Sequence, residues 1–113
     1  MEFTFKEDNH IGLYELQGNL IGEKDGITIT ESFTEQLDKG LKNFVIDLQN
    51  LQHINSSGLG VLITLLTKAR KSGGEVTLSN PSDYIKNLLL ITKLNTIFQI
   101  HSTKEEAMEV FSK

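Results

Sequence analysis

Small polar residues and glycines cluster between positions 54 and 61, where the chain reads Ile54-Asn55-Ser56-Ser57-Gly58-Leu59-Gly60-Val61. Any of the three polar residues could cap the helix that follows them. Gly58 and Gly60 fall in the first turn of that helix, where each glycine costs up to about 1 kcal/mol relative to alanine. Glycines at this spacing indicate either tight packing of the helix on a sheet or close approach of another molecule to the backbone.

Ser57 stands at a position that suits phosphate chemistry. It follows a buried strand and begins a helix, and the positive end of a helix dipole favours a bound or covalent phosphate. The carboxyl ends of strands are also where open α/β sheets meet their ligands and partners. Spacing alone leaves a second interpretation open, in which Ser56 and Ser57 are ordinary capping residues. No capping box supports that interpretation, because Gly60 stands where a Glu or Gln would be.

A hydrolase is the enzyme that these residue types could form, with Asp47, His53 and Ser57 as a catalytic triad. The context disfavours it, because a nucleophile elbow requires Gly-x-Ser-x-Gly and Asn55 stands two residues before Ser57. No P-loop pattern is present. The histidines fall in separate loops without paired carboxylates, so we predict no metal, no cofactor and no catalysis; they are His10, His53 and His101.

The composition is that of one soluble globular domain, which we expect to span residues 1–113. Apolar residues make up 38% and charged residues 23% of the chain, and the net charge is −4. The negative charge argues against nucleic acid as a partner. Cysteine is absent, which removes disulfides and thiol chemistry and fits a reducing compartment. No stretch approaches the roughly 20 apolar residues of a spanning helix, so we expect a cytoplasmic protein without direct membrane insertion.

Hydrophobic periodicity predicts strands and helices in alternation after an opening hairpin. The order is β-β-α-β-α-β-α-β-α, which indicates an α/β fold with a mixed, mostly parallel sheet and helices packed on it. The expected strands are 3–5, 11–17, 44–48, 76–78 and 97–100, with a loop after residue 48. The expected helices run from about 24 to 40, 59 to 72, 82 to 91 and 104 to 111.

Two stripes on the helix after Ser57 are predicted to face in different directions. The stripe that should pack on the sheet consists of Leu59, Leu62, Ile63 and Leu66. The stripe that should face outward consists of Ser57, Val61, Thr64 and Lys68. Val61 and Leu65 are too apolar to be explained by exposure to water, so they either contact a partner or pack against a neighbouring helix.

The chain resembles the bacterial anti-sigma factor antagonists of the STAS domain family. The resemblance rests on Val45-Ile46-Asp47-Leu48, on the buried anchors Leu51 and Ile54, on residues 55–62 and on Ser72-Gly73-Gly74-Glu75-Val76. It covers essentially the whole chain and implies a STAS-like fold. Two positions differ from the family pattern: Asn55 stands where Asp is usual, and Ile21 ends a segment that is often Gly-x-Leu-Asp.

The resemblance implies a regulatory switch centred on Ser57. In that family an unphosphorylated domain binds an anti-sigma factor that is also a serine kinase, phosphorylation of the matching serine breaks the complex, and a metal-dependent serine phosphatase reverses it. The residues expected to meet the partner are Asn55, Ser56, Gly58, Gly60, Val61 and Thr64. The alternative within the same fold is a STAS-like subunit that docks on the ATPase of a membrane transporter without a phosphorylation cycle.

Overall fold

The secondary structure follows the predicted order, with one additional 3-10 turn. The computed structural model describes residues 1–112. Its elements are β1 (Glu2–Asp8), β2 (Ile11–Leu20), α1 (Glu23–Asp38), β3 (Asn43–Ile54), α2 (Ser56–Lys71), β4 (Glu75–Ser79), α3 (Asp83–Ile91), η1 (Leu94–Thr96), β5 (Gln99–His101) and α4 (Lys104–Glu109). The predicted single-domain α/β fold is therefore confirmed.

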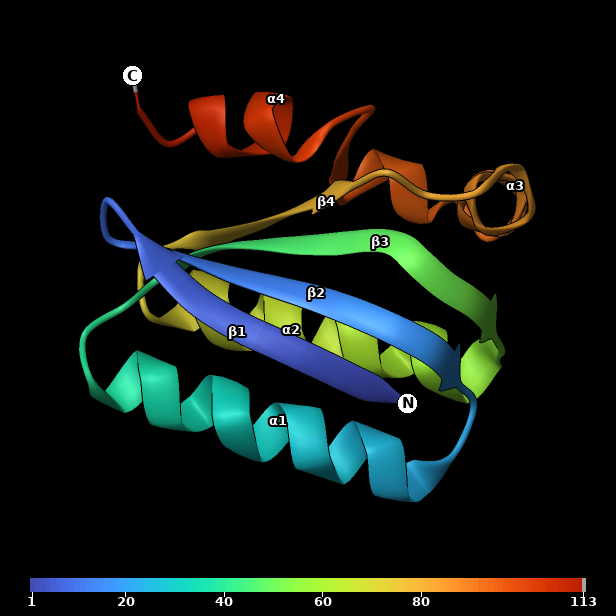
Figure 1. The fold of residues 1–113 in the computed structure, drawn as a ribbon, viewed down its shortest axis with the longest axis horizontal. Helices are drawn as coiled ribbons and strands as arrows, with labels where there is room; N and C mark the ends of the chain where they lie inside the picture. The colour runs from blue at the N-terminus through green and yellow to red at the C-terminus, as the bar shows by residue number, and fades with distance from the viewer. Residues whose placement is uncertain (113) are drawn as a thin grey trace.

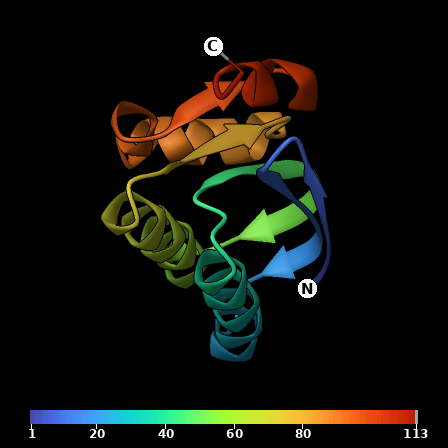
Figure 2. The ribbon, with the colours of Figure 1, turned by 90° about the vertical axis from the view of Figure 1, so that its left-hand side faces the viewer.

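The centre of the fold is one five-stranded sheet, whose strands lie in the order β1-β2-β3-β4-β5. The β1–β2 pair is antiparallel and the other pairs are parallel. Helices α1 and α2 lie side by side against one face, and α4 lies across the opposite face (Figures 1 and 2). The main core fills the space between the sheet and the α1–α2 pair, and includes Tyr14, Phe33, Phe44, Ile46 and Leu62. A smaller core under α4 consists of Ile11, Leu13, Val45 and Ala107.

Strand β3 is longer than the sequence predicts. The expected loop after residue 48 is wrong, because the strand continues to Ile54 and pairs with the end of β2, where Leu20 lies opposite Ile54. The pairing of β2 with β3 shifts register between Glu15 and Gln17 and between Gly18 and Asn19, and each shift leaves one extra residue in β3, which interrupts the alternation of its buried residues. Leu51 and Ile54 are buried as expected, each 2% exposed. Only Asn55 separates the strand from α2, so Ser57 is held by a short junction between two regular elements.

Helix α2 is rotated slightly from its expected orientation. Leu65 is fully buried, whereas Ile63 is 36% exposed, so the assignment of Ile63 to the inner stripe is wrong. The reason is the position of α1, which covers one flank of α2 and extends the buried arc towards Leu65. The sequence left open whether Val61 and Leu65 contact a partner or a neighbouring helix, and Leu65 belongs to the core.

Helix α1 is fixed to the sheet through its polar residues as well as its apolar face. The Tyr14 hydroxyl and Ser32 Oγ are 2.8 Å apart and share a hydrogen bond. Burial raises the pKa of Tyr14, while the bond to Ser32 acts in the opposite direction. At the start of the helix, the α-amino group of Met1 donates to Asp25 Oδ1 at 3.1 Å. These contacts tie α1 to β2 and to the residue that precedes β1.

Candidate functional site

Asn55 is the N-cap of α2 and also ties that helix to the end of β2. Its Oδ1 accepts a hydrogen bond from the Gly58 backbone N–H at 2.9 Å. Its Nδ2 donates to the Ile21 carbonyl at 3.0 Å. An aspartate could accept the first bond but could not donate the second. The asparagine at this position therefore joins two backbone segments that the usual acidic residue would leave unconnected.

Replacing Asn55 by Ala is expected to destabilise the domain by about 1–2 kcal/mol, because a helix cap and a bond to a backbone carbonyl are lost together. Asn55→Asp should recover part of this loss, since a carboxylate still caps the helix and interacts favourably with its dipole. Urea unfolding of the three proteins measures the order. Equal stability of Asn55→Asp and the parent protein would show that the Ile21 bond contributes nothing.

Ser57 is exposed at the second position of α2, and its hydroxyl has no hydrogen-bond partner among residues 1–112. The Gly58 and Leu59 N–H groups already bond to Asn55. The N–H groups of Ser56 and Ser57 belong to the first turn, whose amides have no partners within the helix. A phosphate on Ser57 would meet these donors and the positive end of the dipole. The capping interpretation does not apply to Ser57, because Asn55 performs that role.

The two glycines of the first turn have different surroundings. A Cβ on Gly58 would overlap the Leu20 carbonyl and lie 2.6 Å from Ile54 Cγ1, so packing against β2 requires a glycine. A Cβ on Gly60 would have no heavy atom within 4 Å, apart from its chain neighbours and the helix backbone. Gly58 is buried and Gly60 is exposed. The fold therefore accounts for Gly58 but gives no reason for Gly60.

Ser57 lies at one end of a groove between α1 and α2, which we call the α1–α2 groove. Val61 and Gly26 make the closest contact across it: a Cβ on Gly26 would lie 2.7 Å from Val61 Cγ2. Val61 is thus half-buried against α1, while Thr64 is exposed. From α2 the groove is lined by Ser57, Gly60, Val61 and Thr64. From α1 it is lined by Gly22, Glu23, Gly26, Ile27, Thr30, Glu31, Thr34, Glu35 and Asp38.

The α1 half of this groove was not predicted as part of the site. Sequence reasoning considered only the buried stripe of α1 and did not examine its outer side. One signal was present: Gly26 lies inside a helix, where glycine is unfavourable without a close neighbour. Ser56 is exposed but does not line the groove, whereas Ser57 does. The two adjacent serines therefore have different surroundings.

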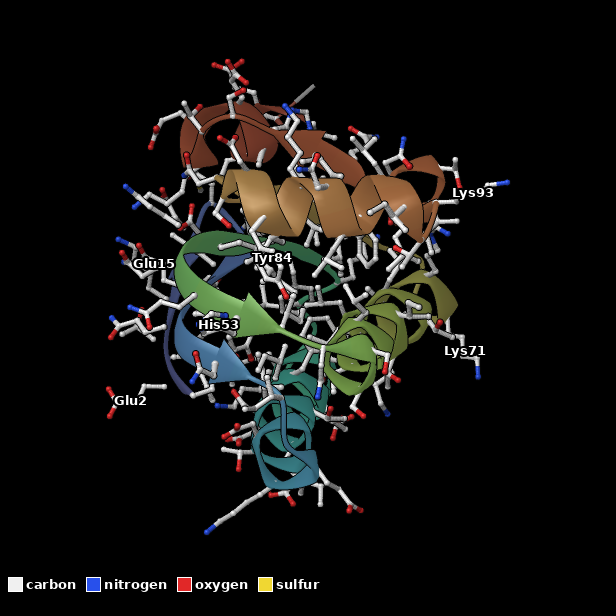
Figure 3. All side chains as sticks on the ribbon, turned by 90° about the vertical axis from the view of Figure 1, so that its right-hand side faces the viewer. Glu2, Glu15, His53, Lys71, Tyr84 and Lys93 are labelled. Atoms are coloured by element: carbon white, nitrogen blue, oxygen red, sulfur yellow. The ribbon has the colours of Figure 1, made fainter. Side chains whose placement is uncertain are left out.

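The three residues of the possible hydrolase triad are not brought together. Asp47 accepts hydrogen bonds of 2.7 Å from Ser79 Oγ and from Asn80 Nδ2 on the face of the sheet that α4 covers. His53, at the end of β3, is exposed and stacks edge-on to Tyr84 of α3, with ring centroids 6.2 Å apart (Figure 3). Ser57 is on α2, which covers the face of the sheet opposite Asp47.

The face around Asp47 carries an ion pair that holds α4. Lys104 Nζ donates to Glu15 Oε2 at 3.1 Å, and this hydrogen bond raises the pKa of Lys104.

In residues 1–112, no group of three or more His, Asp or Glu side chains could hold a metal ion. The described helices include none that is both long and apolar enough to cross a membrane.

The family whose pattern covers residues 2–107 is the STAS domain family, and the chain belongs to it. A Thermotoga maritima protein, named as a candidate anti-sigma factor antagonist, is 35% identical over 77 residues, which are 68% of each chain. The crystal structure of a Thermotoga maritima protein of the same description gives a TM-score of 0.90 at 25% identity, covering 98% of this chain and 95% of that one.

The Bacillus anti-sigma factor antagonist SpoIIAA shares the fold at 19% identity, and its structure is known with and without a phosphate. Its unphosphorylated form gives a TM-score of 0.82 and covers 96% of this chain and 94% of its own. Its phosphorylated form gives a TM-score of 0.76 and covers 96% of this chain and 97% of its own. A protein of this fold thus keeps its architecture when it carries a phosphate.

Proposed function

We propose that this protein is an anti-sigma factor antagonist that binds an anti-sigma factor with serine-kinase activity in the cytoplasm. It acts by binding and is not itself an enzyme. In the unphosphorylated state it captures the anti-sigma factor, which frees a sigma factor for transcription. Transfer of the γ-phosphoryl group of ATP to Ser57 Oγ releases the partner, and a serine phosphatase restores the binding state by hydrolysis.

The observation that carries this proposal is the availability of Ser57. Its hydroxyl is exposed and without an intramolecular partner because Asn55 caps the helix instead. A kinase can therefore reach the acceptor oxygen without unfolding the first turn of α2. Ser57 also lines the α1–α2 groove, so a modification there changes the surface that a partner would meet. We assign Gly60, Val61 and Thr64 to that surface, and Asn55 and Gly58 to positioning Ser57.

Incubation with an anti-sigma factor kinase of the same source organism and ATP is expected to place one phosphate on Ser57 and none on Ser56. The reason is that only Ser57 lines the groove at which the partner is proposed to bind. Peptide mass spectrometry locates the phosphate, and Ser57→Ala serves as the matched acceptor-free protein. Phosphate on Ser56 alone would contradict the assignment. A kinase that binds the domain but transfers no phosphate would also contradict the assignment.

A further inference from the structure

The open space above Gly60 is the first indication that the α1–α2 groove has an occupant. A helix-interior glycine is unfavourable relative to alanine, and the surroundings of Gly60 place no steric limit on a side chain. Gly26 and Gly58, in contrast, are each required by a close neighbour in the fold. A glycine that the fold does not need, among the lining residues of a groove beside Ser57, is explained by a surface that approaches the α2 backbone closely.

The charge of the groove is the second indication. Four carboxylates line it, from Glu23, Glu31, Glu35 and Asp38, and no Lys, Arg or His is among its lining residues in the described part of the chain. Within residues 1–112, Glu35 is the one carboxylate of this set in an ion pair, with Lys39 Nζ at 3.4 Å in an exposed pair that begins on the same helix. Between the carboxylates, the surface is made of Gly26, Ile27, Thr30, Thr34 and Val61. Ile27 is 51% exposed there without covering side chains.

The dimensions of the groove fit a helix. Its α1 side extends from Gly22 to Asp38, which is about 24 Å at 1.5 Å per residue, and its α2 side extends from Ser57 to Thr64. Helices pack by placing a ridge of side chains in a groove, and small residues at the contact shorten the distance between the axes. An acidic rim around such a groove selects a basic occupant, because complementary charge favours the correct partner and its rate of association.

We propose that the α1–α2 groove receives a helix of the anti-sigma partner with a ridge of small apolar side chains flanked by Lys and Arg residues. This inference rests on the proposed function and extends the interface from Ser57 along α1. The small ridge lies over Gly60, next to Ile27 and Val61. The basic residues meet the carboxylates of Glu31, Glu35 and Asp38. The groove thus sets which partner binds, and Ser57 sets when it binds.

Two changes in the groove test this inference, with the cognate anti-sigma factor kinase as the probe in calorimetric titration. Gly60→Ala is expected to weaken binding at least about tenfold, because a methyl group occupies the space of the ridge, while the melting temperature stays equal or rises. The double variant Glu31→Gln/Asp38→Asn is expected to weaken binding about tenfold at low salt and less at high salt. Its control is Glu105→Gln/Glu109→Gln, an equal change of charge on exposed residues of α4.

The outcomes separate this inference from the proposed function. Loss of affinity in both groove variants, with the α4 control unchanged, supports a basic helix in the groove. If the parent protein binds the kinase and both groove variants bind equally well, the groove is empty in the complex and only this inference fails. If the α4 control loses as much affinity as the charge variant of the groove, the effect comes from net charge alone and this inference is also wrong. If the parent protein does not bind the kinase, both this inference and the proposed function are wrong.

Discussion

Ser57→Asp is expected to weaken binding of the anti-sigma partner about a hundredfold, close to 2.7 kcal/mol, because a desolvated charge enters a close interface. Gly60 lines the groove next to Ser57 and its backbone is uncovered, so a partner that contacts this backbone would leave no room for a hydrated anion. In the proposed complex, basic residues of the partner would not compensate for the new charge, since they would already pair with the carboxylates that line the groove. Phosphoserine, with about −1.5 to −2 charges, should have a larger effect than aspartate.

The same substitution is expected to leave the fold intact. A negative charge at the second position of α2 meets the first-turn amides and the positive end of the dipole. Thermal melting and calorimetric titration measure the two effects separately, and Ser57→Asn is the matched control with the same shape and no charge. A fall in melting temperature that parallels the loss of binding would show that the switch works by unfolding. If the Asp and Asn variants bind the partner with equal affinity, the negative charge is not the cause of the switch.

Gly58→Ala is expected to be the most destabilising single-methyl substitution in the site, by about 3 kcal/mol. The added methyl would overlap the Leu20 carbonyl and crowd Ile54 Cγ1, which belong to the paired ends of β2 and β3. Neither group can easily move away from the methyl, because Leu20 and Ile54 are almost completely buried. Typical domains are stable by only 5–15 kcal/mol, so this loss is large.

Gly60→Ala provides the control for Gly58→Ala, two residues along the same helix. It removes the unfavourable entropy of a helical glycine and meets no neighbour, so urea unfolding should show unchanged or increased stability. The contrast between the two variants measures the packing of α2 on β2, free of helix propensity. Equal destabilisation by both would mean that propensity alone determines the outcome and that the close contact at Leu20 relaxes.

Local patterns in the sequence were sufficient to predict the order of elements and the position of Ser57. The hairpin, the four helices and the parallel strands follow from periodicity and from breaks at glycines, and these signals do not depend on distant residues. The end of β3 could not be predicted, because Leu51 and Ile54 are three residues apart and a strand alternates with a period of two. Their burial depends on two shifts in the pairing with β2, each of which leaves one extra residue in β3.

The orientation of α2 and the α1–α2 groove could not be predicted for a different reason. Both depend on how closely two helices approach, which the contact of Gly26 with Val61 determines in three dimensions. Leu65 and Ile63 are almost equally apolar, so only the position of α1 decides which of them is buried. The outer residues of α1 have no unusual pattern of their own, and they become a surface only beside Gly60 and Thr64.

The cap at Asn55 has a consequence for how this protein can evolve. Because Asn55 holds the first turn of α2, the Ser57 side chain contributes nothing that folding requires. Alanine at this position would be well tolerated by a helix, so under the proposed function one substitution would turn a regulated binder into a constitutive one without loss of folded protein. The reverse change would install the proposed acceptor equally easily. Kinase control as proposed here could therefore be gained or lost in a single step, while the architecture of the domain stays under separate selection.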